Sequence, residues 1–475
     1  MLAWAFQSRK MEALQIWHKT ILKNEFTARN ETNEFNLEDY LALEKRLFEE
    51  LQEKVYEKVN PTNELMYSRY RPEGPQDPAW LQQNWNRTFE LVPDNITGGA
   101  LLLHGLTDSP YSLRRIGEIL HAKGFYVLGL RLPGHGTMPG ALTQVHWEDW
   151  VAASRIGARH VRERIGSKRP FFIAGYSNGG GLAVKYALDA LNNPSLPVPD
   201  RLLLFSPEIA INPLARIANF HKLLSFIPYF EKFKWESVEP EYDPFKYNSF
   251  SMNAAHEAWE VTDAIERQIQ DSLDMGRIKN IPDILTFLSW SDATVKTSAT
   301  IQRLYSQLKN PGSELIIFDV NRLDRIDFFI PAVNETPLLQ LQTRSDLPYR
   351  LTVITNITND SAKVTQKTKA PNSNIIDYEP LEMSWPNGIY SLSHVAIPFA
   401  PDDPVYGSSK ATVGDYQGIP LGALQPRGET HLLVTSLNRL MRLRYNPFFA
   451  YVENRVAIEI DKVLQYDKVG NPTPN

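Results

Sequence analysis

The chain begins with a charged, helical pattern and then changes to short apolar runs. Within the first 80 residues, large apolar side chains recur at helical spacing among many Glu and Lys residues, as in Leu37–Val59. Pro72, Pro75 and Pro78 then interrupt the pattern. We expect residues 1–80 to form an N-terminal helical arm that packs on the rest of the chain; binding of a partner is the alternative.

From Arg87 onward, short apolar runs alternate with amphipathic helices. The predicted strands are Thr88–Val92, Ala100–Leu103, Tyr126–Leu130, Pro170–Ala174, Leu202–Phe205, Ile284–Leu288 and Glu314–Phe318. The predicted helices are Ser112–Lys123, His146–Ile165, Gly179–Leu191, Thr297–Leu308, Leu432–Arg444 and Phe448–Gln465. Nearly all-apolar strands that alternate with helices indicate an α/β domain over residues 81–475, with a mostly parallel central sheet and helices on both faces.

Two segments interrupt this alternation. Residues 208–280 show helical patterns, including Pro213–Lys234 and Asn253–Met275, and no strand pattern. We expect this segment to be a helical lid. Residues 320–390 contain β-branched runs such as Arg350–Thr358, which predict a β-rich insertion.

Composition and charge exclude several classes of protein. The 475 residues include no cysteine, which excludes disulfides, thiolate metal sites and a cysteine nucleophile. The net charge of −5 does not favour nucleic acid as a partner. No apolar run reaches the roughly 18 residues of a membrane span, but peripheral contact with lipid stays open. The compartment also stays open, because Met1–Phe6 fits the stub of a removed anchor in a bacterial cell envelope as well as a cytoplasmic start.

The strongest chemical signal is Gly175-Tyr-Ser-Asn-Gly179, which lies between a predicted strand and a predicted helix. This context is typical of a nucleophile elbow, in which Ser177 stands on a sharp turn that the glycines permit. The backbone N–H of Asn178 would open the helix and face developing negative charge. A second such donor is expected from a neighbouring loop, and Leu106 N–H, after the strand that ends at Leu103, is the candidate.

Other histidines near strand ends have structural interpretations. His104 and His135 follow strands directly, and we expect both to shape their loops rather than to act as bases. The run His146–Asp149 fits a helix start better than a metal site. The chain contains no phosphate-binding or dinucleotide glycine motif, so no metal and no cofactor are expected.

Three motifs together resemble the α/β-hydrolase superfamily: LLLHGLTDSPYS at Leu101–Ser112, LRLPGHG at Leu130–Gly136 and GYSNG at Gly175–Gly179. The similarity is greatest to its monoacylglycerol-lipase and carboxylesterase branch, which includes lysophospholipase-like proteins. The resemblance implies the α/β-hydrolase fold and a serine nucleophile that is followed along the chain by an acid and then a histidine. It also implies ester substrates with an apolar acyl group, such as monoacylglycerols or lysophospholipids.

The expected order can be tested against the acids that follow the lid. Asp292 comes after the strand Ile284–Leu288 and matches the acid loop of the family. Asp319, Asp324 and Asp327 are rivals on the next loop.

For the histidine, His394 lies in a short loop-like segment, whereas the rival His431 opens a predicted helix. We therefore predict a Ser177–Asp292–His394 triad. The separation of 102 positions from Asp292 to His394 exceeds the spacing usual in this family.

The predicted lid carries many large apolar residues, and Phe220, Leu224, Phe226 and Phe230 are candidates for a wall around an acyl chain. Packing of the lid on the core is the alternative. Two other functions stay open: the same triad could transfer an acyl group or cleave an amide, and the chain could be an inactive binding protein on the same fold.

Overall fold

A ten-stranded sheet forms the centre of the computed structural model. The described residues are 11–60, 62, 65–81, 83–210, 228–292, 294–295, 297–323, 332–408, 418–423 and 441–470. In sheet order the strands are β1 (Phe89–Leu91), β3 (Phe125–Leu130), β2 (Gly98–Leu103), β4 (Phe171–Tyr176), β5 (Arg201–Phe205), β8 (Asp283–Ser289), β9 (Glu314–Phe318), β10 (Arg350–Asn356), β11 (Lys363–Lys369) and β12 (Ile376–Ser384). The strands from β3 to β10 in this order are parallel, while β1 at one end and β11 and β12 at the other pair antiparallel with their neighbours.

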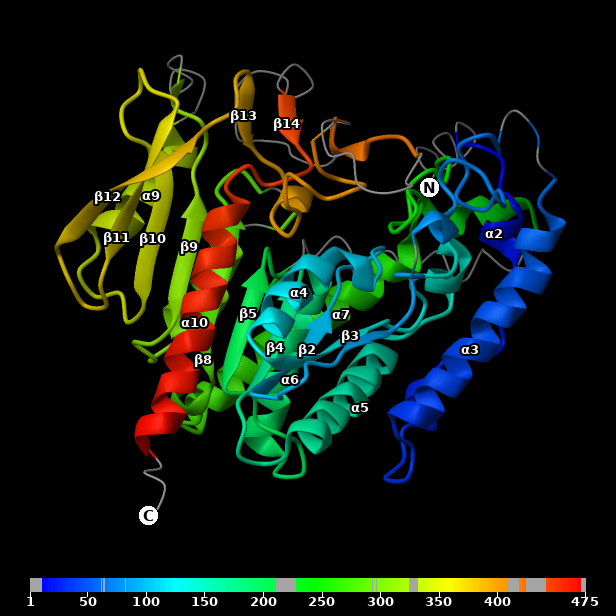
Figure 1. The fold of residues 1–475 in the computed structure, drawn as a ribbon, viewed down its shortest axis with the longest axis horizontal. Helices are drawn as coiled ribbons and strands as arrows, with labels where there is room; N and C mark the ends of the chain where they lie inside the picture. The colour runs from blue at the N-terminus through cyan, green and yellow to red at the C-terminus, as the bar shows by residue number, and fades with distance from the viewer. Residues whose placement is uncertain are drawn as a thin grey trace.

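Helices cover both faces of the sheet (Figure 1). One face packs against α5 (Trp147–Ile165), α6 (Asn178–Asn192) and α7 (Met252–Asp274), and the other against α4 (Arg114–Ala122) and α10 (Phe449–Gly470). Leu101 and Leu103 of β2 enter the first core, and Ala100 and Leu102 enter the second. Burial on both faces explains the continuous apolar runs, and the predicted α/β class with a mostly parallel sheet is confirmed.

The N-terminal helices lie against this domain. The longer one, α3 (Leu37–Lys54), begins at Asn36, whose side chain accepts the Asp39 N–H, and runs beside α5 (Figure 1). A shorter helix, α2 (Ile16–Lys19), precedes it. Tyr40 on α3 is buried and donates its hydroxyl proton to Arg131 O at 2.5 Å. None of the described helices is both long enough and apolar enough to cross a bilayer.

The segment 208–280 differs from the prediction that it contains no strand. It holds a short 3₁₀ helix, η8 (Pro228–Lys234), and two short antiparallel strands, β6 (Trp235–Ser237) and β7 (Phe250–Ser251), before α7. The Glu241 carboxylate holds the loop between β6 and β7 together. It accepts the backbone N–H of Asn248 at 3.0 Å and that of Ser249 at 2.8 Å. The prediction was wrong here because strands of two or three residues are too short to show a period of two.

The C-terminal half also corrects two expectations. The β-rich segment 320–390 is an extension of the central sheet, since β10 pairs in parallel with β9 and is followed by β11 and β12. A helix, α9 (Ala332–Thr343), precedes these strands. At the end of the predicted helix Leu432–Arg444, residues Met441–Leu443 instead form a strand, β14, which pairs with β13 (Ile389–Leu392). Because β13 is distant from β14 in sequence, no local pattern predicted this pairing. Residues 424–440, which include the first part of the predicted helix, lie outside the described residues.

The region around the predicted helix Thr297–Leu308 is helical but irregular. It contains α8 (Thr297–Ala299), a π-helical turn over Thr300–Leu304 and a 3₁₀ turn over Tyr305–Gln307. The helical prediction therefore holds for this span, while its hydrogen-bonding pattern could not be read from apolar spacing.

Candidate active site

Ser177 stands on the turn between β4 and α6 with φ 55° and ψ −121°. The flanking glycines leave no room for side chains. A Cβ on Gly175 would lie 2.3 Å from Gly179 O, and a Cβ on Gly179 would lie 2.0 Å from Leu103 O. The strand and the helix therefore approach so closely that only glycine fits at these two positions, and the turn has the geometry of a nucleophile elbow.

Three predicted residues that are distant in sequence meet at this turn. His394 Nε2 lies 3.0 Å from Ser177 Oγ, and His394 Nδ1 lies 2.7 Å from Asp292 Oδ2. All three side chains are buried. An ionised carboxylate can only accept, so Nδ1–H donates to Asp292, and Nε2 is left to accept the proton of the Ser177 hydroxyl.

Two serine hydroxyls connect the segment that carries Asp292 to the segment that carries His394. Ser289 Oγ donates to Leu392 O at 2.8 Å, and Ser291 Oγ donates to the same oxygen at 3.2 Å. The carboxyl end of β8 is thereby attached to the end of β13, just before His394. The unusual 102-residue separation is thus closed by local hydrogen bonds.

The charges around His394 favour its protonated form. Burial lowers the pKa of His394, but the Asp292 carboxylate raises it, and the net pKa lies above its ordinary value. Burial also raises the pKa of Glu208 to about 7, with a lowering effect from His394. Glu208 Oε2 is buried without a hydrogen-bond partner among the described residues. Glu208 could not be predicted from the sequence, because it follows β5 in no recognisable motif.

The two predicted oxyanion donors lie next to Ser177. Asn178 is the first residue of α6, so its N–H has no acceptor within the helix. A Cβ on Gly105 would lie 3.1 Å from Ser177 Cβ, which places the loop of Leu106 against the serine. Thr107, the next residue, has φ 67°, which lies in the left-handed region that residues other than glycine rarely adopt.

A part of the segment between β6 and β7 holds this strained loop in place. Tyr247 N donates to Thr107 O at 2.8 Å, and Lys246 Nζ lies 3.3 Å from Asp108 Oδ1. Asp108 is buried, and burial raises its pKa while Lys246 lowers it. These two contacts cross about 140 residues of sequence, and no motif predicted them.

His104 and His135 occupy structural positions. His104 Nδ1 lies 3.0 Å from Gly105 O, and its Nε2 accepts the Leu132 N–H at 3.0 Å. His135 Nδ1 lies 3.0 Å from Pro133 O. Burial lowers the pKa of both rings, to about 4 for His135, so both are neutral; His104 connects two loops, and His135 bonds within its own turn.

A cavity of about 450 Å³ opens beside His394. Its lining includes aromatic and apolar side chains together with charged ones, among them Tyr242, Tyr247, Phe250, Val395, Glu236, Lys246 and Arg444. The predicted acyl wall cannot be compared with it: Phe220, Leu224 and Phe226 lie outside the described residues, as does the side chain of Phe230.

Among the rival acids, the structure describes Asp319, whose carboxylate is hydrogen-bonded to residues other than His394. Asp319 Oδ2 accepts hydrogen bonds from Arg322 Nε at 2.9 Å and from Thr355 Oγ1 at 2.8 Å. Asp324, Asp327 and the rival histidine His431 lie outside the described residues.

Near the start of α5, His146, Glu148 and Glu257 offer ligand atoms within 4.8 Å of one another. The first two side chains are exposed, and Glu257 also accepts the N–H of Trp147 at 3.0 Å. Exposed acidic groups often gather in this way without an ion, so the cluster does not by itself indicate a metal site.

The central part of the chain is similar to known proteins. Residues 95–320 match the family described as serine aminopeptidase, S33. A thermostable monoacylglycerol lipase of Bacillus sp. (strain H-257) is 35% identical over 89 residues, which cover 19% of this chain and 34% of the lipase. The chain therefore aligns with about a third of that relative.

Solved structures with low sequence identity are also similar. One is a metagenome-derived lipolytic enzyme from a study of LipS and LipT, with 20% identity, 55% of this chain and 98% of that chain covered, and a TM-score of 0.37. Another is a monoacylglycerol lipase of Paleococcus ferrophilus, with 21% identity, 49% and 88% covered, and a TM-score of 0.37. The family match is thus confined to residues 95–320, and the parallel sheet with its elbow gives this part of the chain an α/β-hydrolase fold.

Proposed function

We propose that the chain is a serine hydrolase that cleaves carboxylic esters with Ser177 as nucleophile. The observation that carries this proposal is the buried hydrogen-bonded series Asp292–His394–Ser177, with bonds of 2.7 and 3.0 Å. A serine hydroxyl is a weak nucleophile unless a base accepts its proton, and a carboxylate on the far side of that base fixes its tautomer.

In the proposed reaction, Ser177 Oγ attacks the ester carbonyl while its proton passes to His394 Nε2. The N–H groups of Leu106 and Asn178 stabilise the oxyanion of the tetrahedral intermediate. Collapse of the intermediate breaks the C–O bond, and the departing alcohol takes the proton from His394. Water then gives a proton to His394 and attacks the acyl-enzyme, which releases the carboxylic acid and restores Ser177.

The proposed substrates are esters with an apolar acyl group, such as monoacylglycerols or lysophospholipids. Support comes from the aligned part of the Bacillus monoacylglycerol lipase and from Tyr242, Phe250 and Val395 in the cavity beside His394. Cleavage of an amide is the second candidate, because the matched family is described as a serine aminopeptidase.

A fluorophosphonate probe tests the nucleophile. We expect the parent protein to be labelled covalently and Ser177→Ala to remain unlabelled, because only an activated serine displaces the fluoride. Ser109→Ala is the matched control, since the hydroxyl of this buried serine on the neighbouring loop has no hydrogen-bond partner among the described residues. Its labelling should equal that of the parent. An unlabelled parent would contradict the hydrolase proposal, and a labelled Ser177→Ala would contradict the choice of serine.

Matched p-nitrophenyl substrates separate the candidate reactions. We expect hydrolysis of the octanoate ester to be faster than that of the acetate ester, and p-nitroanilide amides to be cleaved more slowly than either. Preference for the amide would favour a peptidase, and preference for acetate would contradict the apolar acyl pocket.

The pH dependence follows from the raised pKa of His394. Protonated His394 cannot accept the Ser177 proton, so kcat/KM for a non-ionising ester should fall as the pH decreases through a midpoint above 6.5, the ordinary histidine value. Asp292→Asn should move this midpoint to lower pH, because the raising carboxylate is lost. Since Glu208 titrates near pH 7, the profile is also measured for Glu208→Gln, which should retain the acidic limb. A parent midpoint below 6.5, or loss of the limb in Glu208→Gln, would contradict the assignment to His394.

A further inference from the structure

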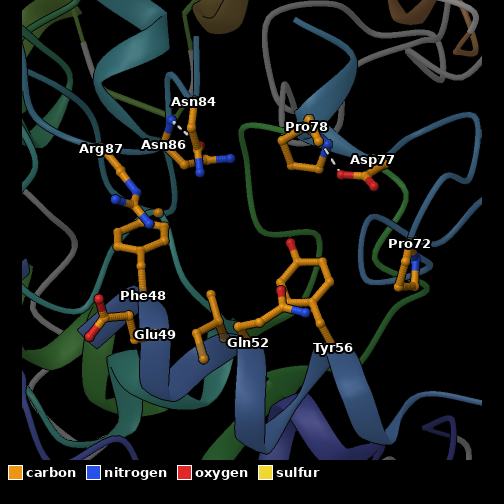
Figure 2. A pocket seen from close by; sticks show the side chains of 13 residues that line it. Phe48, Glu49, Gln52, Tyr56, Pro72, Asp77, Pro78, Asn84, Asn86 and Arg87 are labelled. Atoms are coloured by element: carbon orange, nitrogen blue, oxygen red, sulfur yellow. Dashed lines mark hydrogen bonds between the residues drawn. The ribbon is translucent and has the colours of Figure 1, made fainter. Parts of the chain in front are cut away.

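A second cavity, of about 490 Å³, lies where the N-terminal arm meets the hydrolase domain (Figure 2). It shares no lining residue with the cavity beside His394. One wall comes from α3 and the turn that follows it, and the other comes from the loop before β1 and from Gly136. The lining residues are Phe48, Glu49, Leu51, Gln52, Tyr56, Pro72, Asp77, Pro78, Ala79, Asn84, Asn86, Arg87 and Gly136. Its volume is in the range of small-molecule sites.

Arg87 is the distinctive group in this cavity. Its guanidinium lies over the ring of Phe48 (Figure 2), and the guanidinium carbon is 4.2 Å from the ring centroid. Among the described residues it makes no ion pair, and its Nε is buried without a hydrogen-bond partner. Stacking uses the face of a guanidinium and leaves its in-plane N–H groups available to a carboxylate.

Nearby carboxylates balance only part of the positive charge of Arg87. Burial lowers the pKa of Arg87, and the carboxylates of Glu44 and Glu49 oppose this effect only in part, while Arg131 adds to it. Glu44 is engaged elsewhere, because its carboxylate pairs with Arg131 Nε at 3.0 Å and accepts the Thr88 hydroxyl proton at 2.7 Å. A partly buried cation without its own counter-ion gains when a bound anion supplies one.

The other lining groups limit the kind of anion. Arg87 is the only cationic side chain in the described lining, beside the carboxylates of Glu49 and Asp77, so it can pair with one negative charge of a ligand and not with a second. Asp77 is occupied, since Oδ1 accepts the Ala79 N–H and Oδ2 accepts the Glu73 N–H, both at 2.9 Å. Glu49 is exposed at the rim and disfavours a second negative charge.

The remaining walls are suited to an apolar body. Leu51, Pro72, Pro78 and Ala79 present carbon surface, while the amides of Gln52 and Asn84 add neutral polar groups. We propose that this cavity binds a small monocarboxylate, with its carboxylate on Arg87 and its apolar body against these side chains. The site is independent of the proposed ester hydrolysis.

Calorimetric titration with octanoate tests this site. We expect saturable binding with a Kd of about 1 mM or tighter, and at least about tenfold weaker binding to Arg87→Met, which loses a charge-assisted pair. Gln52→Trp keeps Arg87 but fills the cavity with a ring, and it should also abolish binding. Arg46→Met is the matched control, because Arg46 is an exposed arginine on α3, the helix that carries Gln52, and does not line the cavity.

The probes and variants also separate this site from other sources of binding. Octanol and inorganic phosphate should bind at least about tenfold more weakly than octanoate, because one lacks the charge and the other lacks the apolar body. Binding that persists in both Arg87→Met and Gln52→Trp would place octanoate elsewhere, such as beside His394, and would overturn the proposal. Equal binding of octanol, or no saturable octanoate binding, would overturn it as well. Circular dichroism of each variant confirms that it is folded.

Discussion

Asp292→Asn is expected to lower kcat/KM for p-nitrophenyl octanoate by about 10⁴-fold while the protein stays folded. The variant side chain has nearly the same shape, so the 2.7 Å contact with His394 Nδ1 can persist. The amide has no charge, however, and it can present its NH₂ group to Nδ1. That reversal would put the ring proton on Nε2, where it blocks transfer from Ser177. Steady-state kinetics on matched protein preparations measure the effect.

Asp319→Asn is the matched control for this prediction. Asp319 is the rival acid on the loop after β9, but it is hydrogen-bonded to Arg322 and Thr355 rather than to the histidine. We expect its kcat/KM to change by less than about tenfold once the folded fraction is taken into account. If Asp319→Asn loses as much activity as Asp292→Asn, the choice of acid is wrong.

Arg131→Met is expected to give the largest loss of stability, about 3–5 kcal/mol in the free energy of unfolding. Arg131 is 1% exposed and pairs with two carboxylates of the arm segment, with Nη2 2.9 Å from Glu25 Oε1 and Nε 3.0 Å from Glu44 Oε2. Removing the guanidinium leaves Glu44 buried with an uncompensated charge. Urea unfolding followed by circular dichroism measures the change.

Two further variants show whether the buried charge is the cause. Arg131→Met combined with Glu44→Gln should recover part of the loss, because the unpaired charge is removed. Arg303→Met breaks an exposed pair with Glu266 and should change stability by less than about 1 kcal/mol. A loss for Arg131→Met as small as that for Arg303→Met would show that the arm does not depend on this ion cluster.

Residues that act through their immediate neighbours could be predicted from the sequence. The elbow was recognisable because its glycines and Ser177 are consecutive and lie between an apolar strand and a helix. The buried parallel strands were recognisable because burial on both faces requires a continuous apolar run. For example, Glu314–Phe318 was predicted with the bounds that β9 has in the structure.

Contacts between distant segments could not be predicted in this way. The contact of Lys246 with Asp108 and the pairing of β14 with β13 each join residues that no local pattern relates. The same holds for β10, whose β-branched run suggested a separate insertion until its register with β9 showed that it extends the sheet.

By itself, the sequence determined the α/β class, the elbow at Ser177 and a short choice of acids and histidines. These follow from backbone sterics and burial, which act on each residue and its near neighbours. Only the tertiary structure decided that His394 meets Asp292 across 102 residues, and that Arg87 faces a cavity and makes no ion pair among the described residues. Both depend on which loops and helices the sheet brings together, and sequence distance does not set spatial distance.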